Sequence, residues 1–260
     1  MRKFTYWRPE MSDILTERAG NILSIQLNRP AKKNAMTSSM YITMAELLNG
    51  AAKDDQISVV LWHAAGNSFS AGNDIEDFMK NPPAPGDSPQ AQLIHALINF
   101  EKPLVAAVQG AAIGGGTTML AHCDFVYAGE SAKFQLPFVN LALVPEFGSS
   151  YLLPLRFGYT HAAELILLGR PFDASRAAEL GLVTQVVPDQ NLLATATETA
   201  RTLAAKPAAA VQASKRLMKR PLREQLEQAV KLELEVFAER VRSDDAKKAF
   251  TAFFARRQPA

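Results

Sequence analysis

The stretch KPLVAAVQGAAIGGGTTM, residues 102–119, decides how this chain folds. Its first half is a continuous apolar run, which is typical of a strand covered on both faces. Three consecutive glycines then allow a tight turn, and apolar residues resume directly behind it. We therefore expect a buried strand, a tight turn and a buried helix. The glycines and threonines within residues 103–122 make this region a poor membrane span.

Three other stretches predict strands. NILSIQLNRP (21–30) alternates apolar and polar residues, whereas ISVVLWHAAG (57–66) and CDFVYAG (123–129) are largely continuous apolar runs. Between the first two lies TSSMYITMAELLNGAA (37–52), whose apolar residues have helical spacing behind a serine or threonine N-cap. Strands separated by helical segments of this length pair in parallel through right-handed crossovers. The predicted fold class is therefore α/β.

The chain from Thr160 onward is expected to be mostly helical. We predict short helices at 160–169 and 173–181, the second capped by Asp173, and three long helices from about residue 190 to the end. In the second of these long helices, apolar residues recur on one face, namely Leu222, Leu226, Val230, Leu234 and Phe237. Such a stripe packs against the core or against another subunit.

Composition excludes several classes of protein. The 260 residues are 48% hydrophobic and 21% charged, which is typical of one large globular domain or two smaller ones. The net charge of +2 indicates no special partner. The single cysteine, Cys123, excludes an internal disulfide and a cysteine-based metal cluster, and it fits a reducing compartment. Because the four histidines lack metal-ligand spacing, we expect no metal site.

Targeting and nucleic-acid signals are weak. Residues 1–10 carry positive charge without a following apolar run, so they do not form a secretory signal, and with Met11 as the start they would be an extension. The basic run SKRLMKRPLR (214–223) has an acidic neighbour and no interleaved aromatic residue, which favours a solvated helix face over nucleic-acid binding. We expect neither a nucleic-acid nor a membrane partner, and the absence of a Ser-Lys-Leu ending favours a cytoplasmic protein.

Two glycine turns could hold a negatively charged oxygen. FSAGNDI (69–75) and AAIGGGTTM (111–119) both follow predicted strands, at the edge where α/β sheets bind ligands. Neither turn matches a dinucleotide or phosphate-loop motif, so nucleotide chemistry is not expected. Two backbone N–H groups that converge on one point would form an oxyanion hole, although each turn taken singly is more often a tight connection.

One acid stands in apolar surroundings. LVPEFGSSY (143–151) places Glu146 between a proline and a phenylalanine, just before a run that resembles a helix start. Taken alone, Glu146 is interpreted as a helix cap, because acids stabilise helix N-termini. The serines behind it lack the G-x-S-x-G spacing of a nucleophile.

Together these motifs resemble the crotonase superfamily, also called the enoyl-CoA hydratase/isomerase family. The similarity runs from about Met11 to the end of the chain, and it rests on NRPAKKNAM, FSAGNDI, KPLVAAVQGAAIGGG, CDFVYAGESAKFQLP, GLVTQVVP and AFTAFFARR. The resemblance implies a β-β-α spiral core over residues 11–200 and a helical trimerisation region over residues 201–260. It also implies a homotrimer or hexamer that binds acyl-CoA, with coenzyme A as part of the substrate and no separate cofactor.

The resemblance also implies the site residues. The backbone N–H groups of Asn73 and Gly115 correspond to the oxyanion hole of the family. The segments that hold coenzyme A in the family correspond here to the substrate-binding residues Lys33, Ala35, Ala71, Asp74 and Ile75. Asp74 is also expected to stabilise its own turn. The loop from Asp77 to Ala91 contains prolines and small residues, and we expect it near the substrate entrance.

The acid positions favour one reaction. Hydratases of the family carry two glutamates, at the positions of Thr118 and Phe138, and neither residue can titrate here. The remaining acid, Glu146, coincides with the single glutamate of the peroxisomal-type Δ3,Δ2-enoyl-CoA isomerases. We therefore expect Glu146 to act as acid and base, with its pKa raised by apolar neighbours that include Phe138.

Several alternatives stay open. A hydratase, another acyl-CoA lyase or hydrolase of the family, and a non-catalytic acyl-CoA-binding member in which Glu146 is only a helix cap all fit parts of the pattern. A branch that acts on chlorobenzoyl substrates has an aspartate at the position of Glu146 and a tryptophan at that of Phe138, so dehalogenation is disfavoured. Chain length and branching of the acyl group are not encoded in these motifs.

Overall fold

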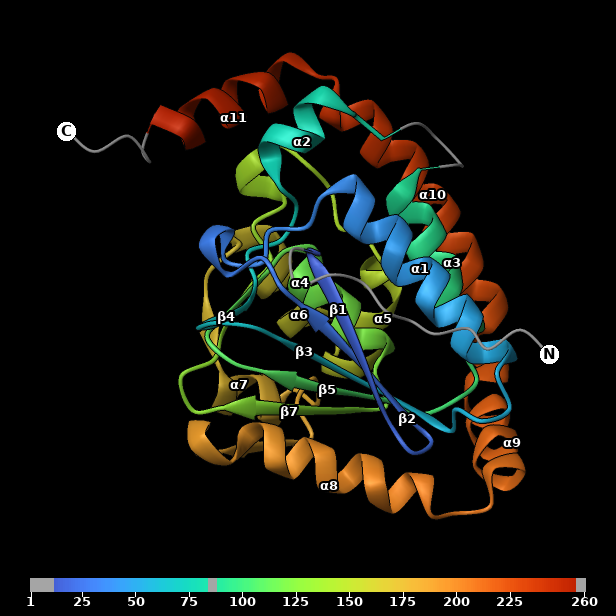
Figure 1. Cartoon of the computed structure of the whole chain (residues 1–260). Helices are drawn as coiled ribbons and strands as arrows, with labels where there is room; N and C mark the ends of the chain where they lie inside the picture. The colour runs from blue at the N-terminus through green and yellow to red at the C-terminus, as the bar shows by residue number, and fades with distance from the viewer. Residues whose placement is uncertain (1–11, 84–87, 256–260) are drawn as a thin grey trace.

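The computed structural model describes residues 12–83 and 88–255. Within them, a six-stranded sheet and a four-stranded sheet are surrounded by helices (Figure 1). The expectations for residues 1–10, for the start at Met11 and for the last residues of the chain lie outside the described residues. No helix in the described ranges is long and apolar enough to cross a membrane.

The larger sheet has the strand order β1-β2-β3-β5-β7-β10. Its strands are β1 (Ile14–Ala19), β2 (Ile22–Leu27), β3 (Val59–Ala64), β5 (Leu104–Val108), β7 (Phe125–Gly129) and β10 (Gln185–Val187). All neighbours are parallel except β1 and β2, which form an antiparallel hairpin. The predicted parallel pairing is therefore confirmed, and β1 joins it as a strand that the sequence patterns did not indicate.

The second sheet is built from very short strands, in the order β4-β6-β8-β9. These strands are β4 (Ser68–Ser70), β6 (Ala111–Ile113), β8 (Lys133–Gln135) and β9 (Phe172–Asp173). None was predicted, because two or three residues are too few to establish an alternating pattern. The buried helix expected after the glycine turn is also shorter than expected, since β6 comes first and α4 covers only Gly115–Thr118, followed by the 3₁₀ turn η2 (Met119–His122).

The two sheets give the chain its spiral course. Three times in succession the chain passes through a strand of the larger sheet, then a strand of the smaller sheet, then a helix: β3-β4-α2, β5-β6-α4 and β7-β8-α5. Helix α2 spans Ile75–Lys80 and helix α5 spans Ser149–Phe157. This arrangement confirms the predicted β-β-α spiral. It also brings the start of α2 and the start of α4 to the same edge of the small sheet.

Both faces of the larger sheet are covered. On one face, α1 (Ser38–Lys53) and α3 (Pro89–Asn99) enclose the main core, which includes Trp62. On the other face, α8 (Leu192–Ala204) packs its buried side against β3, β5 and β7 and runs along the sheet in Figure 1. This two-sided cover explains why β5 is continuously apolar and why β3 is apolar except at His63.

The helical region after β10 contains four helices of 12 residues or more, where three were predicted. These are α8, α9 (Ala208–Lys219), α10 (Arg223–Val241) and α11 (Asp244–Ala255). Pro207 precedes α9 and Pro221 lies between α9 and α10, at places where proline favours the end of one helix and the start of the next. The predicted stripe lies mostly on α10, which packs against α5, and its residues Leu226, Val230 and Phe237 are buried.

Candidate active site

The two glycine turns lie against each other. Gly72 has φ of +83°, and a Cβ atom there would lie 2.7 Å from the carbonyl oxygen of Ile113. On the other side of the same contact, a Cβ atom on Gly116 would lie 2.9 Å from both the Cβ and the carbonyl oxygen of Ser70. Only glycine permits an approach this close. The two turns are therefore locked together at the edge of the small sheet.

The turns expose the two expected N–H groups. A parallel bridge joins Met36 to Asn73 through the carbonyl of Gly72 and the N–H of Asp74, so the N–H of Asn73 itself faces away from Met36. Gly115 is the first residue of α4, where a helix leaves the N–H without an internal partner. Among the described residues, neither N–H donates a recorded hydrogen bond to another protein group.

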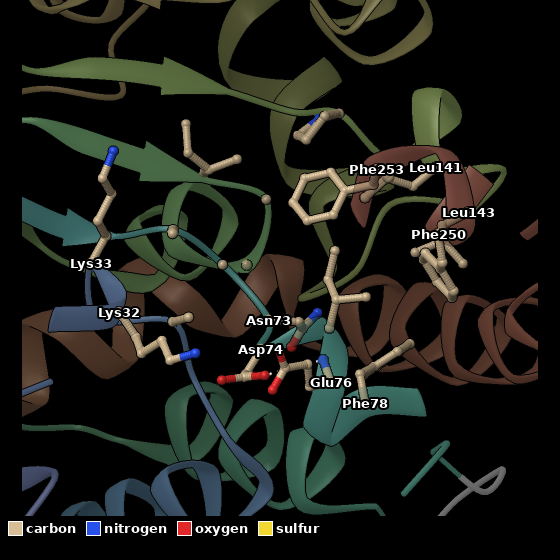
Figure 2. Close-up of a pocket in the computed structure, with 18 of the residues that line it drawn as sticks. Lys32, Lys33, Asn73, Asp74, Glu76, Phe78, Leu141, Leu143, Phe250 and Phe253 are labelled. Atoms are coloured by element: carbon tan, nitrogen blue, oxygen red, sulfur yellow. Dashed lines mark hydrogen bonds between the residues drawn. The ribbon is translucent and has the colours of Figure 1, made fainter. Parts of the chain in front are cut away.

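A pocket of about 380 Å³ opens at this point. Each candidate residue singled out from the sequence borders it: Lys33, Ala35, Ala71, Asn73, Asp74, Ile75, Gly115, Phe138 and Glu146. In Figure 2, Lys32 and Lys33 lie at one end of the pocket and an apolar wall lies at the other. The residues of that wall were not predicted from the sequence; they are Phe78, Leu141, Leu143, Phe250, Phe253 and Phe254. The spacing of the last three on one helix face was the available signal.

Glu146 is buried beside the second glycine turn. A Cβ atom built on Gly115 would lie 2.9 Å from Glu146 Oε1, so the carboxyl group is adjacent to the free N–H of α4. Asn73 Nδ2 donates to the same Oε1 at 3.3 Å. The hydroxyl of Tyr41 donates to Asn73 Oδ1 at 2.7 Å, which fixes the orientation of the amide. The carboxyl group is thus held in place beside the pocket.

The surroundings of Glu146 favour its protonated form. Burial is the main cause that raises the pKa of Glu146 to about 8; the nearby charge of Glu233 contributes to this rise, and the hydrogen bond from Asn73 opposes it. The pKa of Tyr41 is also raised well above 10, by burial and by the charge of Glu146, so its hydroxyl remains a donor. A carboxyl group with a pKa near neutrality can both accept and return a proton.

The interpretation of Glu146 as a helix cap is wrong. Helix α5 begins at Ser149, and the N–H groups of Gly148 and Ser150 donate to Glu233 of α10, at 2.6 Å and 2.8 Å. The recorded side-chain hydrogen bond of Glu146 goes to Asn73 instead. The acid that caps α5 comes from a helix more than 80 residues away in the sequence, so short-range patterns could not identify it.

The other polar residues of the pocket have structural partners or lie at its rim. Asp74 accepts from Arg29 at 2.6 Å and caps α2 through the N–H groups of Glu76 and Asp77, which confirms that it stabilises its turn. Burial pushes the pKa of Asp74 upward, but these hydrogen bonds outweigh it and hold the pKa below its ordinary value. Lys33 is exposed, and its backbone carbonyl accepts from Ala71 at 2.9 Å.

Thr118 and Phe138 offer no acid at the pocket. Thr118 is fully buried, lies outside the pocket lining, and places its hydroxyl 3.3 Å from the carbonyl oxygen of Gly114. Phe138 is buried and borders the pocket with its ring. Among the described residues that line the pocket, Glu146 is therefore the one carboxyl group whose pKa is raised. No group of three or more metal-binding side chains occurs in the described ranges.

The chain is similar to known proteins over nearly its whole length. The model of the enoyl-CoA hydratase/isomerase family matches residues 17–260. The chain is 36% identical over 255 residues to enoyl-CoA hydratase EchA19 of Mycobacterium tuberculosis, covering 95% of each protein. It is 34% identical over 254 residues to enoyl-CoA delta isomerase 2 of Rattus norvegicus, covering 95% of this chain and 65% of that protein.

A solved structure agrees with the fold. The crystal structure of an enoyl-CoA hydratase/isomerase from Pseudoalteromonas atlantica is 40% identical, with a TM-score of 0.90 over 96% of this chain and 99% of that one. Hydratases and isomerases are thus similar to this chain at comparable identity. The comparisons do not favour the peroxisomal isomerase branch over the others.

Proposed function

This chain belongs to the enoyl-CoA hydratase/isomerase family, and from that premise we propose that it shifts the double bond of a 3-enoyl-CoA to give the 2-trans-enoyl-CoA. The observation that supports the proposal is which acidic residues stand at the catalytic positions of the pocket. One buried carboxyl group, Glu146, has its pKa raised to about 8, while the positions of the two hydratase glutamates hold Thr118 and Phe138. The peroxisomal-type isomerases have the same single glutamate.

The reaction needs one proton acceptor and one anion site. In the proposed mechanism, the thioester carbonyl oxygen accepts hydrogen bonds from the N–H groups of Asn73 and Gly115. Ionised Glu146 removes a proton from C2, and the electrons move to the thioester oxygen as a dienolate. Protonated Glu146 then returns the proton at C4, which leaves the double bond between C2 and C3. The oxyanion hole stabilises the charge where it develops.

The pocket lining also supports an acyl-CoA substrate. The exposed lysines Lys32 and Lys33 at one end suit the phosphates of coenzyme A. The apolar wall formed by Leu141, Phe250 and Phe253 suits an acyl chain, because burial of its methylene groups contributes about 0.8 kcal/mol each. Both features agree with the substrate class that the family acts on.

We also propose that residues 201–260 mediate assembly into a homotrimer. Leu217 and Met218 on α9 and Leu232 on α10 are large apolar side chains that are 60% to 70% exposed. Exposed apolar residues on neighbouring helices are typical of protein interfaces. Light scattering coupled to size-exclusion chromatography measures the mass, and a monomer at micromolar concentration would contradict this assignment.

The test of the reaction uses a 3-enoyl-CoA of medium chain length and follows the conjugated product by ultraviolet absorbance. We expect turnover with the wild type, a loss of at least about 100-fold in Glu146→Gln, and wild-type activity in Glu235→Gln, which changes an exposed acid of α10. A parallel assay follows hydration of 2-enoyl-CoA. Fast hydration with slow isomerisation would refute the proposal in favour of a hydratase, and binding without turnover would favour a non-catalytic member.

A further inference from the structure

The backbone that carries Glu146 into the pocket adopts an unusual conformation. Phe147 and Gly148 follow it with φ of +63° and +68°, so two consecutive residues are left-handed. A bulky residue such as phenylalanine rarely adopts this conformation unless its surroundings enforce it. The turn is also pressed against α10, because a Cβ atom on Gly148 would lie 2.4 Å from Leu226 Cδ1. Other groups must therefore hold this turn in place.

Two buried side chains from distant elements hold it. Glu233 of α10 is 7% exposed, and each of its carboxyl oxygens accepts one backbone N–H, from Gly148 at 2.6 Å and from Ser150 at 2.8 Å. His122, at the end of η2, lies 2.7 Å through Nε2 from the carbonyl oxygen of Phe147. Since a carbonyl only accepts, Nε2 carries the proton. Burial lowers the pKa of His122 to about 3, so the ring is neutral.

Glu233 lies close to Glu146 but outside the substrate pocket. It is not among the residues that line the pocket. Glu146 and Glu233 both border a second, much smaller cavity of about 10 Å³, which has room for about one water molecule. Glu233 therefore reaches the turn from behind, on the side away from the substrate.

We propose that Glu233 is a positioning residue for Glu146, and that its carboxylate holds the left-handed turn that directs the base into the pocket. This inference rests on the proposed function, in which Glu146 is the base. Glu233 does not contact the substrate in this arrangement. It acts on the reaction through the position of Glu146 and through the negative charge that it places behind it.

The negative charge of Glu233 should have a measurable effect on the pKa of Glu146. Burial raises the pKa of Glu233 to about 7, against the opposing hydrogen bonds from Ser150 and Gly148. When Glu233 is ionised, it raises the pKa of Glu146. The other titratable groups that reach this turn in the described ranges are Tyr41 from α1, whose hydroxyl stays protonated, and neutral His122 from η2. Loss of the charge at residue 233 should therefore lower the pKa of Glu146.

The experiment separates the hydrogen bonds from the charge with two variants. Glu233→Gln removes the charge and one of the two acceptor oxygens, whereas Glu233→Asp keeps the charge but is one methylene shorter. Glu235→Gln removes an exposed charge from the same helix and is the matched control. The pH profiles of kcat and kcat/KM are measured for all four proteins. In parallel, ¹³C NMR of glutamate-labelled protein follows the titration of Glu146, assigned with Glu146→Gln.

We expect kcat to fall by about 10- to 100-fold in both Glu233 variants, because small displacements of a catalytic group have effects of this size. KM should stay within about twofold, since Glu233 is not part of the pocket wall. The acid limb of kcat/KM follows the ionisation of Glu146, so it should move to lower pH by about one unit in Glu233→Gln. It should stay in place in Glu233→Asp and in the control.

The experiment distinguishes a failure of this inference about Glu233 from a failure of the proposed isomerase function. An unchanged kcat and acid limb in Glu233→Gln would overturn the inference. If the wild type fails to isomerise 3-enoyl-CoA, the proposed function fails alone, and the NMR titration still decides the role of Glu233. A lower pKa of Glu146 in Glu233→Gln, but not in Glu235→Gln, supports the inference, and equal values overturn it. Circular dichroism identifies any variant that does not fold.

Discussion

Replacing the proposed base should make the protein more stable, and more so as the pH rises. The change is Glu146→Gln, which keeps the size of the side chain and an oxygen that can accept from Asn73. A glutamate in the unfolded chain ionises from about pH 4.5 upward, whereas the pKa of Glu146 in the folded protein is about 8. The folded protein therefore holds a proton that the unfolded chain releases in this range. Its stability falls as the pH rises from about 4.5 to 8 and is flat above that.

The magnitude follows from the two pKa values. They differ by about 3.5, and each unit corresponds to about 1.4 kcal/mol, so ionisation of the buried group above pH 8 costs at most about 5 kcal/mol. At pH 5 the cost is below about 1 kcal/mol, because this pH lies only about half a unit above the pKa of the unfolded chain, so keeping the proton there costs little. Glutamine has no such cost. The stability difference between variant and wild type should therefore grow by about 2 to 4 kcal/mol between pH 5 and pH 8.

The assay is thermal unfolding at fixed protein concentration across pH 5 to 9. For a domain of this size, 1 kcal/mol corresponds to about 2 to 4 °C, so the Tm difference between variant and wild type should grow by about 4 to 16 °C between pH 5 and pH 8. Glu235→Gln on the exposed face of α10 is the control, and its difference should not depend on pH. A difference between Glu146→Gln and wild type that is flat from pH 5 to 9 would refute the burial argument.

Two further substitutions test how the site is assembled. Gly72→Ala should destabilise the protein by at least about 2 kcal/mol and abolish activity, because its Cβ would enter the second glycine turn. Gly20→Ala is the control, since Gly20 also has a positive φ but has open space around it. This control should lose only about 1 kcal/mol of stability in urea denaturation and should keep its turnover. Tyr41→Phe removes the hydroxyl that orients Asn73 and should lower kcat with little change in KM, at a stability cost of about 1 to 3 kcal/mol. Tyr127→Phe is the control, because it loses a similar 2.7 Å hydrogen bond on the far side of the sheet, and it should change stability without changing kcat. If Tyr41→Phe and Tyr127→Phe changed kcat equally, the assigned role of Tyr41 would be contradicted.

The larger sheet could be predicted from sequence because its strands are long enough to show a pattern. β5 is five residues of continuous apolar sequence, β3 is apolar at all of its six positions except His63, and their cover on both faces follows from that. The short strands β4 and β6 could not be recognised, since three residues carry no periodicity. They depend instead on pairing with segments about 40 residues away, which is a property of the folded chain.

Some parts of the candidate site could likewise be predicted from the sequence, and others could not. Asn73, Gly115 and Glu146 were identified from motifs, and the structure places them around one pocket. The capping role of Glu233 was not identified, because it joins α10 to α5 across 83 to 85 residues. Local sequence contains the glycines that permit the turns. It does not contain the distant side chains that hold those turns in place.

Part of the apolar wall of the pocket comes from a different region of the chain than the pocket's polar groups. Gly115 and Glu146 are set by turns of the spiral core, whereas Phe250 and Phe253 come from α11, the last helix. For the proposed reaction, we therefore expect substitutions on α11 to change which acyl chains fit without moving the groups that transfer the proton. In the proposed reaction, the choice of acyl chain therefore depends in part on α11, whereas proton transfer depends on the spiral core.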